Sequence, residues 1–326
     1  MKKSLIALAV LGAFAGAASA QSSVTIYGFV DVAAAKPIGT QDKQIVDGAQ
    51  FGGGSRLGFR GEEDLGGGWK GVFGMEHRFS ADTGTQSNAT NFWQGYSTVG
   101  IVSPYGAVRL GRQYTPAFLM IQNQIDPFGG ESVAQGRDTG MRFGGVTKVR
   151  VADSIRYDLA VGGFSLGASV AEGDAANGGG VAGAEHKPVS FAANYVVGPV
   201  WLGVGYENPA DDQDKVWNIG GRYNFGFMTL AAGYGKGTTA AGVDTKGWLV
   251  GATVPVGAVD IKVMYATNNV DNLGDTRKIG VGAHYNFSKR TKVYVDYGKV
   301  SGDLTAIGAA VDANSTGYDL GIKHVF

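Results

Sequence analysis

Charged residues in this chain recur at every second position of short segments, and the residues between them are apolar. In the stretch from Arg56 to Glu62, a strand would turn Leu57 and Phe59 to one face and Arg56, Arg60 and Glu62 to the other. Stretches 71–79 and 150–157 repeat this pattern. An arginine against lipid near the bilayer midplane costs about 2–4 kcal/mol, so the charged face is expected to meet water. The expected pore-wall residues are Arg56, Arg60, Arg78, Arg112, Arg150, Arg156, Glu62 and Glu76.

Arg112 needs a local irregularity to join this set. Strict alternation from Val108 and Leu110 would turn its side chain to the apolar face. A β-bulge near the end of this strand would re-aim it toward water.

The longest internal stretch without alternation, 115–147, follows this strand. Connections beyond about 12–15 residues are usually functional or disordered, and the apolar run from Phe118 to Ile121 gives this one a means of packing. We expect the loop to fold into a barrel, narrow it at mid-height and set Asp126 and Glu131 across from the wall arginines. The expected constriction-loop residues are Asp126, Pro127, Phe128, Gly129, Gly130 and Glu131.

The last nine residues form one further alternating segment. Tyr318, Leu320, Ile322 and the terminal Phe326 share a face with His324, and the other face carries Asp319, Gly321, Lys323 and Val325. This pattern is typical of a terminal strand with lipid on one side and water on the other.

Alternation of this kind predicts about sixteen strands along the chain. Tight connections such as 64–67, 198–199 and 255–257 alternate along the chain with longer polar loops, as in bacterial outer-membrane barrels. Sixteen strands leave room for an aqueous channel. The predicted fold is all-β, a 16-stranded antiparallel transmembrane β-barrel with an inward-folded long third loop. The expected strands are 23–35, 54–63, 68–80, 91–102, 106–114, 148–160, 163–172, 188–198, 200–208, 215–225, 227–236, 245–255, 258–268, 277–287, 290–301 and 315–326.

Aromatic residues gather near the ends of these strands, where rings at headgroup depth would form two girdles. They are Tyr27, Trp69, Phe79, Trp93, Trp201, Tyr206, Phe225, Phe227, Tyr285, Phe287 and Phe326.

The N-terminus has the pattern of a cleaved export signal. Lys2 and Lys3 precede an apolar run that ends in Ala18-Ser19-Ala20. We expect a signal peptide at 1–20 and a single barrel domain at 21–326. Cleavage would leave 306 residues (326 − 20) with 26 basic and 28 acidic side chains (28 − 2 against 28), a formal charge of −2.

Composition argues against several other classes of function. A near-neutral chain has no bulk attraction for nucleic acid, and the absence of cysteine removes thiol catalysis and thiolate metal sites. The chain has four histidines; alternation turns His77, His284 and His324 toward lipid, and His186 lies in a loop, so a Ser/His/acid triad is disfavoured. Loop acids such as Asp211, Asp212 and Asp214, or Asp271 and Asp275, could bind a divalent cation between loops, but they lack metal-ligand spacing, which favours solvated loop charge. We therefore expect neither enzymatic activity nor a cofactor or metal.

Several separated motifs resemble the general porins of Gram-negative bacteria, particularly those of beta-proteobacteria. They are 55–68, 110–116, 126–130, the opening 23–28 and the closing Phe326. The resemblance implies a homotrimer in the outer membrane, each subunit with its own channel, in which Arg56 and Arg112 belong to the constriction and Arg150 is a looser match. Many relatives carry an acid between the residues that match Pro127 and Phe128, which here are adjacent.

The sequence thus predicts an outer-membrane general diffusion porin that passes small hydrophilic solutes and ions with a mild anion preference. Its expected surroundings are outer-membrane lipid and lipopolysaccharide. The alternatives are a channel specific for small anions or organic acids, and a plugged structural barrel.

Overall fold

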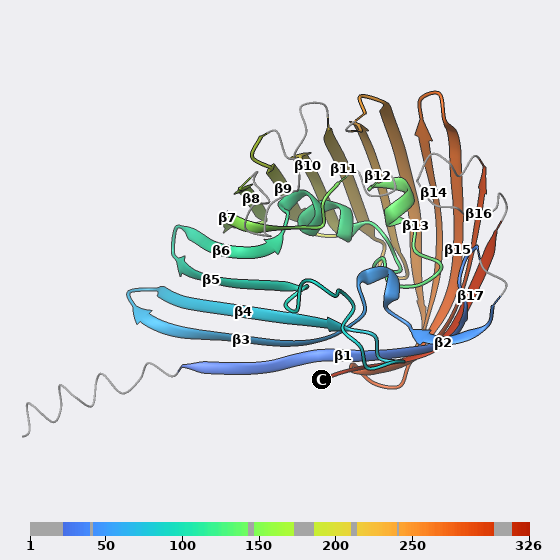
Figure 1. Cartoon of the computed structure of the whole chain (residues 1–326), viewed down its shortest axis with the longest axis horizontal. Helices are drawn as coiled ribbons and strands as arrows, with labels where there is room; N and C mark the ends of the chain where they lie inside the picture. The colour runs from blue at the N-terminus through green and yellow to red at the C-terminus, as the bar shows by residue number, and fades with distance from the viewer. Residues whose placement is uncertain are drawn as a thin grey trace, which may run out of the picture.

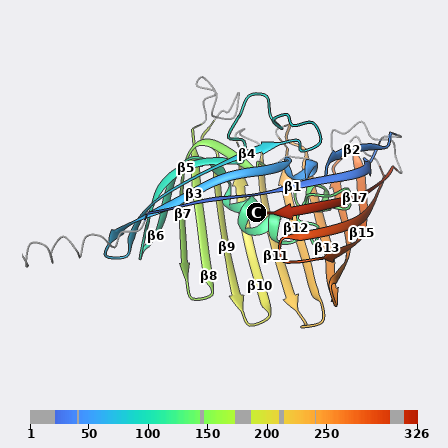
Figure 2. The same ribbon diagram turned by 90° about the horizontal axis from the view of Figure 1, so that it is seen from below.

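The computed structural model describes residues 22–39, 42–142, 147–172, 186–209, 214–239, 241–302 and 315–326. Its strands form one antiparallel sheet that closes on itself, because β1 pairs with β3 on one side and with β17 on the other (Figure 1). The sheet has 17 strands, of which β2 is a short segment beside β1, so the barrel wall has the 16 predicted strands (17 − 1). Figure 2 shows the hairpins that join β9 to β10 and β11 to β12 at the same end of the barrel. The strands are β1 (Ser23–Lys36), β2 (Gln44–Asp47), β3 (Ser55–Gly66), β4 (Trp69–Phe79), β5 (Tyr96–Ser103), β6 (Gly106–Tyr114), β7 (Arg150–Val161), β8 (Phe164–Ala171), β9 (Val189–Val197), β10 (Val200–Asn208), β11 (Lys215–Asn224), β12 (Thr229–Thr238), β13 (Asp244–Val256), β14 (Val259–Val270), β15 (Gly274–Asn286), β16 (Thr291–Gly302) and β17 (Thr316–Val325).

Most strand limits agree with the sequence prediction to within about three residues, with two exceptions. The fifth strand begins at Tyr96 rather than 91, because the Asn88 side chain accepts the backbone N–H groups of Thr90 and Asn91 and holds that stretch in a turn. The predicted loop 36–53 contains β2 and a 3-10 turn at Gln50–Gly52, η2, neither of which was expected.

The two faces of the wall differ as alternation predicts. Along β17, Tyr318, Leu320 and Ile322 are exposed on the outer face, whereas Asp319 and Lys323 are buried on the face that we call the inner face. Phe326 exchanges backbone hydrogen bonds with Gly28 at 3.0 and 3.1 Å, so the chain end seals the barrel against β1.

Of the rings expected in the aromatic girdles, most are exposed, and two lie on the inner face. Trp69, Phe225, Phe227, Tyr285, Phe287 and Phe326 are exposed. Trp201 is instead buried on the inner face, where it packs with Ile121 and Ile125. Tyr27 also lies on the inner face, and its hydroxyl donates to Glu76. A position near a strand end says nothing of the face, which strand phase decides.

The segment between β6 and β7 lies against the inner face of the wall. It contains three short helical turns: η3 (Ala117–Ile121), η4 (Gln122–Gln124) and α2 (Arg137–Gly140). Wall glycines make room for it: a Cβ on Gly280 would lie 2.1 Å from the Ala134 carbonyl oxygen, and one on Gly298 would lie 2.3 Å from that of Val133. Glycine on these strands is therefore required by close backbone approach.

Among the described residues, no helix has the length and apolar character to cross a membrane. The predicted signal peptide at 1–20 lies outside the described residues.

Candidate functional site

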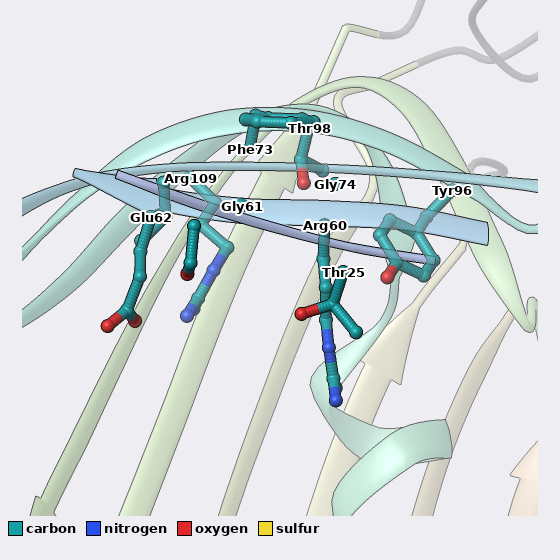
Figure 3. Close-up of a pocket in the computed structure, with 11 residues that line it drawn as sticks. Thr25, Arg60, Gly61, Glu62, Phe73, Gly74, Tyr96, Thr98 and Arg109 are labelled. Carbon is teal, nitrogen blue, oxygen red and sulfur yellow. The ribbon is translucent and has the colours of Figure 1, made fainter. Parts of the chain in front are cut away.

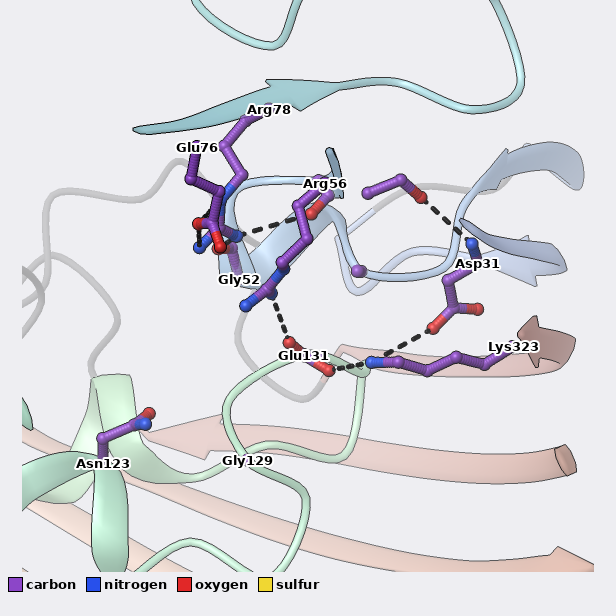
Figure 4. Close-up of polar contacts among 12 residues, drawn as sticks. Asp31, Gly52, Arg56, Glu76, Arg78, Asn123, Gly129, Glu131 and Lys323 are labelled. Atoms are coloured by element: carbon purple, nitrogen blue, oxygen red, sulfur yellow. Dashed lines mark hydrogen bonds and ion pairs between the residues drawn. The ribbon is translucent and has the colours of Figure 1, made fainter. Parts of the chain in front are cut away.

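The candidate site contains Arg56 and Arg78, which lie on two neighbouring strands. The two residues lie directly opposite each other on β3 and β4. Like charges in this position repel, so each arginine needs a carboxylate, and each has one. Arg78 pairs with Glu76 at 2.6 Å, and Arg56 pairs with Glu131 at 2.6 Å (Figure 4).

The Arg78–Glu76 pair is almost completely buried, with side-chain exposures of 1% and 6%. The guanidinium of Arg78 also donates to the Gly52 carbonyl at 3.0 Å and to the Tyr114 hydroxyl at 2.7 Å. These bonds tie β4 to the turn after β2 and to β6. This arginine therefore has a structural role in the wall and offers little surface to a passing ion.

Glu131 bridges two strands that lie on either side of β1. Its carboxylate accepts from Arg56 on β3 and from the ammonium group of Lys323 on β17, and Lys323 lies 3.9 Å from Asp31 on β1 (Figure 4). Burial alone would raise the pKa of Glu131, but Lys323 and Arg56 outweigh it and hold the pKa at about 2. The carboxylate is therefore charged at neutral pH.

These residues face a cavity of about 380 Å³ whose charge is strongly unbalanced. Five arginines and two glutamates line it, and Asp138 behind the lining pairs with Arg137 and Arg142, which leaves a formal excess of two positive charges (5 − 3). Arg150 is among them; its guanidinium stacks over the Tyr114 ring at 4.3 Å and donates to the hydroxyl of that residue. The charged lining residues are Arg56, Arg78, Arg137, Arg142, Arg150, Glu76 and Glu131.

Arg112 lies at the expected irregularity. The β6–β7 register shifts between Gly111 and Gln113, where Gly111 has φ +117° and Asp153 on β7 has φ +48°. The predicted bulge is therefore present. Arg112 is half-buried, its Nε donates to the Gln94 carbonyl at 3.2 Å, and it is not among the described residues that line the cavity.

Arg60, Glu62 and Arg156 lie in two further cavities on the inner face. Arg60 and Glu62 project from β3 into a space of about 480 Å³ that Arg109 also lines (Figure 3). Arg109 and Arg156 share the Asp158 carboxylate at 3.0 and 2.5 Å and line a cavity of about 570 Å³. Glu62 forms an exposed ion pair with Lys70.

The expected constriction-loop residues divide into different roles. Asp126 does not face the wall arginines as expected; its buried carboxylate accepts the backbone N–H groups of Phe128, Gly136 and Arg137, so it closes the loop on itself. The Pro127 carbonyl accepts from Lys262 at 2.8 Å. Gly129 and Gly130 have φ of +65° and +71°, a conformation that favours glycine.

Gly130 has a second reason to be glycine. A Cβ there would lie 2.1 Å from the Arg137 guanidinium carbon, so the missing side chain leaves space for an arginine of the cavity. Phe128 packs edge-on against His284, with ring centroids 6.3 Å apart.

Sequence reasoning missed the basic residues of the last strands and assigned His284 to the wrong face. Lys262, Lys278, Lys292 and Lys323 lie on the inner face of β14–β17. His284 is buried there too, and it bonds Asp296 at 3.0 Å rather than facing lipid. Ile279 and Val281 are outward-facing on the same strand, so their phase would have placed Lys278 and His284 inward.

The described part of the chain holds no group of three or more histidine, aspartate or glutamate side chains arranged for a metal ion. Of the loop acids considered above, Asp275 bonds Asn269 and lies 3.7 Å from Arg277, while 211–212 lie outside the described residues.

Comparisons with known proteins agree with this geometry. A family model described as Gram-negative porin matches residues 7–305. The outer membrane porin protein 32 of Delftia acidovorans is 32% identical over 364 aligned residues that cover both chains completely. The structure is similar to an anion-selective porin from Comamonas acidovorans, with a TM-score of 0.78, 27% identity and coverage of 94% and 100% of the two chains. It also resembles OmpT of Vibrio cholerae in a trimer form, with a TM-score of 0.71, 14% identity and coverage of 94% and 99%.

Proposed function

The chain belongs to the Gram-negative porin family and is an outer-membrane barrel, and from this premise we propose that it is a general diffusion pore for small hydrophilic solutes with a mild preference for anions. The observation that carries the proposal is the cavity with five arginines against three acids, two lining glutamates and Asp138 behind them. Arginine does not deprotonate in proteins, so this excess is present at every physiological pH. It raises the local concentration of anions and lowers that of cations.

The segment between β6 and β7 is the proposed constriction. We infer that it narrows the lumen, because the contacts of Glu131, Pro127 and Ala134 reach β3, β14 and β15. On this proposal Arg56, Glu131 and Arg150 meet passing ions, whereas Arg78 and Glu76 hold the wall. Arg112 supports the wall beside them through its bond to Gln94.

A channel specific for organic acids is the second candidate, and one cavity favours it. The space that Arg109 and Arg156 line also has an apolar side formed by Leu119, Met120 and Leu166. Two guanidinium groups that share one carboxylate leave one positive charge beside this apolar surface. An anion with a hydrocarbon body would fit both.

A solute-swelling experiment separates the two candidates. Liposomes that contain the refolded protein would be diluted into solutions of neutral sugars and of mono- and dicarboxylates of increasing size. A general pore gives rates that fall smoothly with size and do not saturate. Saturation by one class of carboxylate, abolished by Arg109→Gln, would contradict the general pore and support the specific channel.

The outer face supports the proposed lipid partners. Lys236 and Lys246 lie directly opposite each other near the long connections, and Tyr234 and Trp248 form the next outward-facing opposed pair toward the barrel middle. Opposed lysines one step beyond an aromatic belt suit the phosphates of lipopolysaccharide. Lys215, Arg277 and Lys299 extend this basic belt. Loss of binding to phosphorylated, but not dephosphorylated, lipid A vesicles in Lys236→Gln/Lys246→Gln would support it.

We further propose a homotrimer, in keeping with the trimer form described for the Vibrio structure. The barrel domain would be 21–326, released from an export signal at 1–20. Mass determination of the exported protein, and its migration on gels before and after heating, would test both points.

A further inference from the structure

A small cavity of about 220 Å³ lies at the connection between β15 and β16, on the rim of tight turns. Ser288, Lys289, Arg290, Thr291, Lys292 and Lys323 line it, and no aspartate or glutamate is among its described lining residues. We propose that this cavity binds a small polyvalent oxyanion and is a second anion-binding site, separate from the arginine cavity. Its place on the ion path rests on the proposed function.

Three of the four cations of the cavity form no direct ion pair with a carboxylate of the described chain. Lys292 and Lys323 lie directly opposite each other on β16 and β17, an arrangement that repels unless an anion is near. Lys323 satisfies this need outside the cavity, because its ammonium group pairs with Glu131 and lies 3.9 Å from Asp31. It therefore contributes mainly its aliphatic stem.

Lys292, in contrast, forms no direct ion pair in the described chain; its hydrogen-bond and ring partners are uncharged, and Glu131 and Asp31 attract it only from a longer distance. Its ammonium group donates to Nδ1 of His284 at 3.2 Å and lies 5.8 Å from the centroid of the Tyr294 ring. Because Nδ1 of His284 accepts this bond, Nε2 carries the ring proton and donates to Asp296. The histidine is thus a neutral linker that fixes Lys292.

The turn supplies two further cations and one hydroxyl donor. Lys289 and Arg290 are exposed, and neither forms an ion pair with a carboxylate of the described chain. Ser288 Oγ accepts the backbone N–H groups of Arg290 and Thr291, each at 3.1 Å. These bonds hold the turn in one shape and leave the hydroxyl hydrogen of Ser288 available to an anion.

Size and charge together define the ligand class. The volume is below the roughly 300–1,000 Å³ of pockets for drug-sized molecules, so the site suits a phosphate, a sulfate or a short dicarboxylate. Three cations without a direct ion pair favour a divalent over a monovalent anion. Charged hydrogen bonds from ammonium, guanidinium and hydroxyl groups suit tetrahedral oxyanions.

The test is block of single-channel chloride current by inorganic phosphate added to either side of a planar bilayer. Phosphate can reach the arginine cavity from both sides of the membrane. A block that is stronger when phosphate is added on one side therefore indicates binding in the turn-rim cavity. The orientation of each inserted channel is identified with a Tyr105→Cys variant that is biotinylated at the new cysteine and probed with streptavidin from each side. Tyr105 is an exposed turn residue, and the chain has no cysteine of its own. The variant is Lys289→Gln/Arg290→Gln, and Lys236→Gln/Lys246→Gln is the control with equal charge loss at the other rim.

We expect half-block from the turn side at a phosphate concentration at least tenfold lower than from the loop side. The difference should fall below twofold in Lys289→Gln/Arg290→Gln and persist in the control. Equal block from both sides in the unaltered protein, or sidedness retained in the variant, would overturn the inference. If the folded protein conducts no chloride, the proposed function fails instead. The site is then decided by phosphorus NMR, where phosphate line broadening should decrease in Lys289→Gln/Arg290→Gln and stay unchanged in the control; an equal decrease in both, or none in either, would overturn the inference.

Discussion

Replacement of Arg78 by methionine tests whether part of the charged inner face is a structural network. The Arg78 and Glu76 side chains are 1% and 6% exposed, and the guanidinium also bonds Gly52 and Tyr114. Methionine keeps much of the stem but leaves the Glu76 carboxylate buried without its cation. Breaking a buried pair in this way costs about 3–5 kcal/mol, so we expect Arg78→Met to lower the free energy of unfolding by that amount.

Urea unfolding in detergent micelles, followed by tryptophan fluorescence, would measure this loss. Glu76→Gln/Arg78→Met removes the stranded carboxylate and should recover part of the stability, with a coupling of about 0.5–3 kcal/mol between the two positions. A loss below about 1 kcal/mol in Arg78→Met, the cost of a solvated surface pair, would refute the reasoning and return Arg78 to the aqueous lumen.

Three further predictions concern the proposed constriction. Glu131→Gln should shift the reversal potential toward greater anion preference, by up to about fivefold in permeability ratio at low salt, since one unit charge at 4 Å in water is worth about 1 kcal/mol; a shift toward cations would contradict the charge balance. Because the pKa of Glu131 is lowered from 4.5 to about 2, its ion pairs contribute fully above pH 4.5 and are lost as the pH falls through about 2. The difference in ion selectivity between the unaltered protein and Glu131→Gln should therefore persist from pH 7 to 4. Disappearance of this difference by pH 5 would count against the pairing. Gly280→Ala places a Cβ 2.1 Å from the Ala134 carbonyl oxygen and should cost about 1–3 kcal/mol of stability. In Gly221→Ala the Cβ would lie 3.2 Å from the movable end of Leu202 and 3.8 Å, an ordinary contact distance, from the Trp201 carbonyl oxygen. Equal effects of the two variants in urea unfolding would show that the loop does not press on the wall.

Strand phase accounts for how much of the fold the sequence could predict. A side-chain period of two is local, so the faces of Leu320 and Lys323, most strand limits and the irregularity at Arg112 follow from the residues themselves. Position in the membrane is not encoded in this way. Trp201 has the spacing of a girdle residue and still lies inside, because the loop supplies the apolar surface that it packs against.

The candidate site was predictable where one strand decides the outcome. Arg56 and Arg150 follow from alternation, and Glu131 meets Arg56 as expected. Asp126 was misread because its three backbone partners lie within the loop and only the folded loop brings them together. Lys323 joins Glu131 across 192 residues of sequence, a contact that needs both the barrel and the folded loop.

The central claim, an open pore with an arginine-dominated constriction, is tested most directly by the reversal potential of single channels of the refolded protein under a potassium chloride gradient. We predict stable conducting steps whose reversal potential lies on the chloride side. A reversal potential on the potassium side would contradict the assignment of the five-arginine cavity to the ion path.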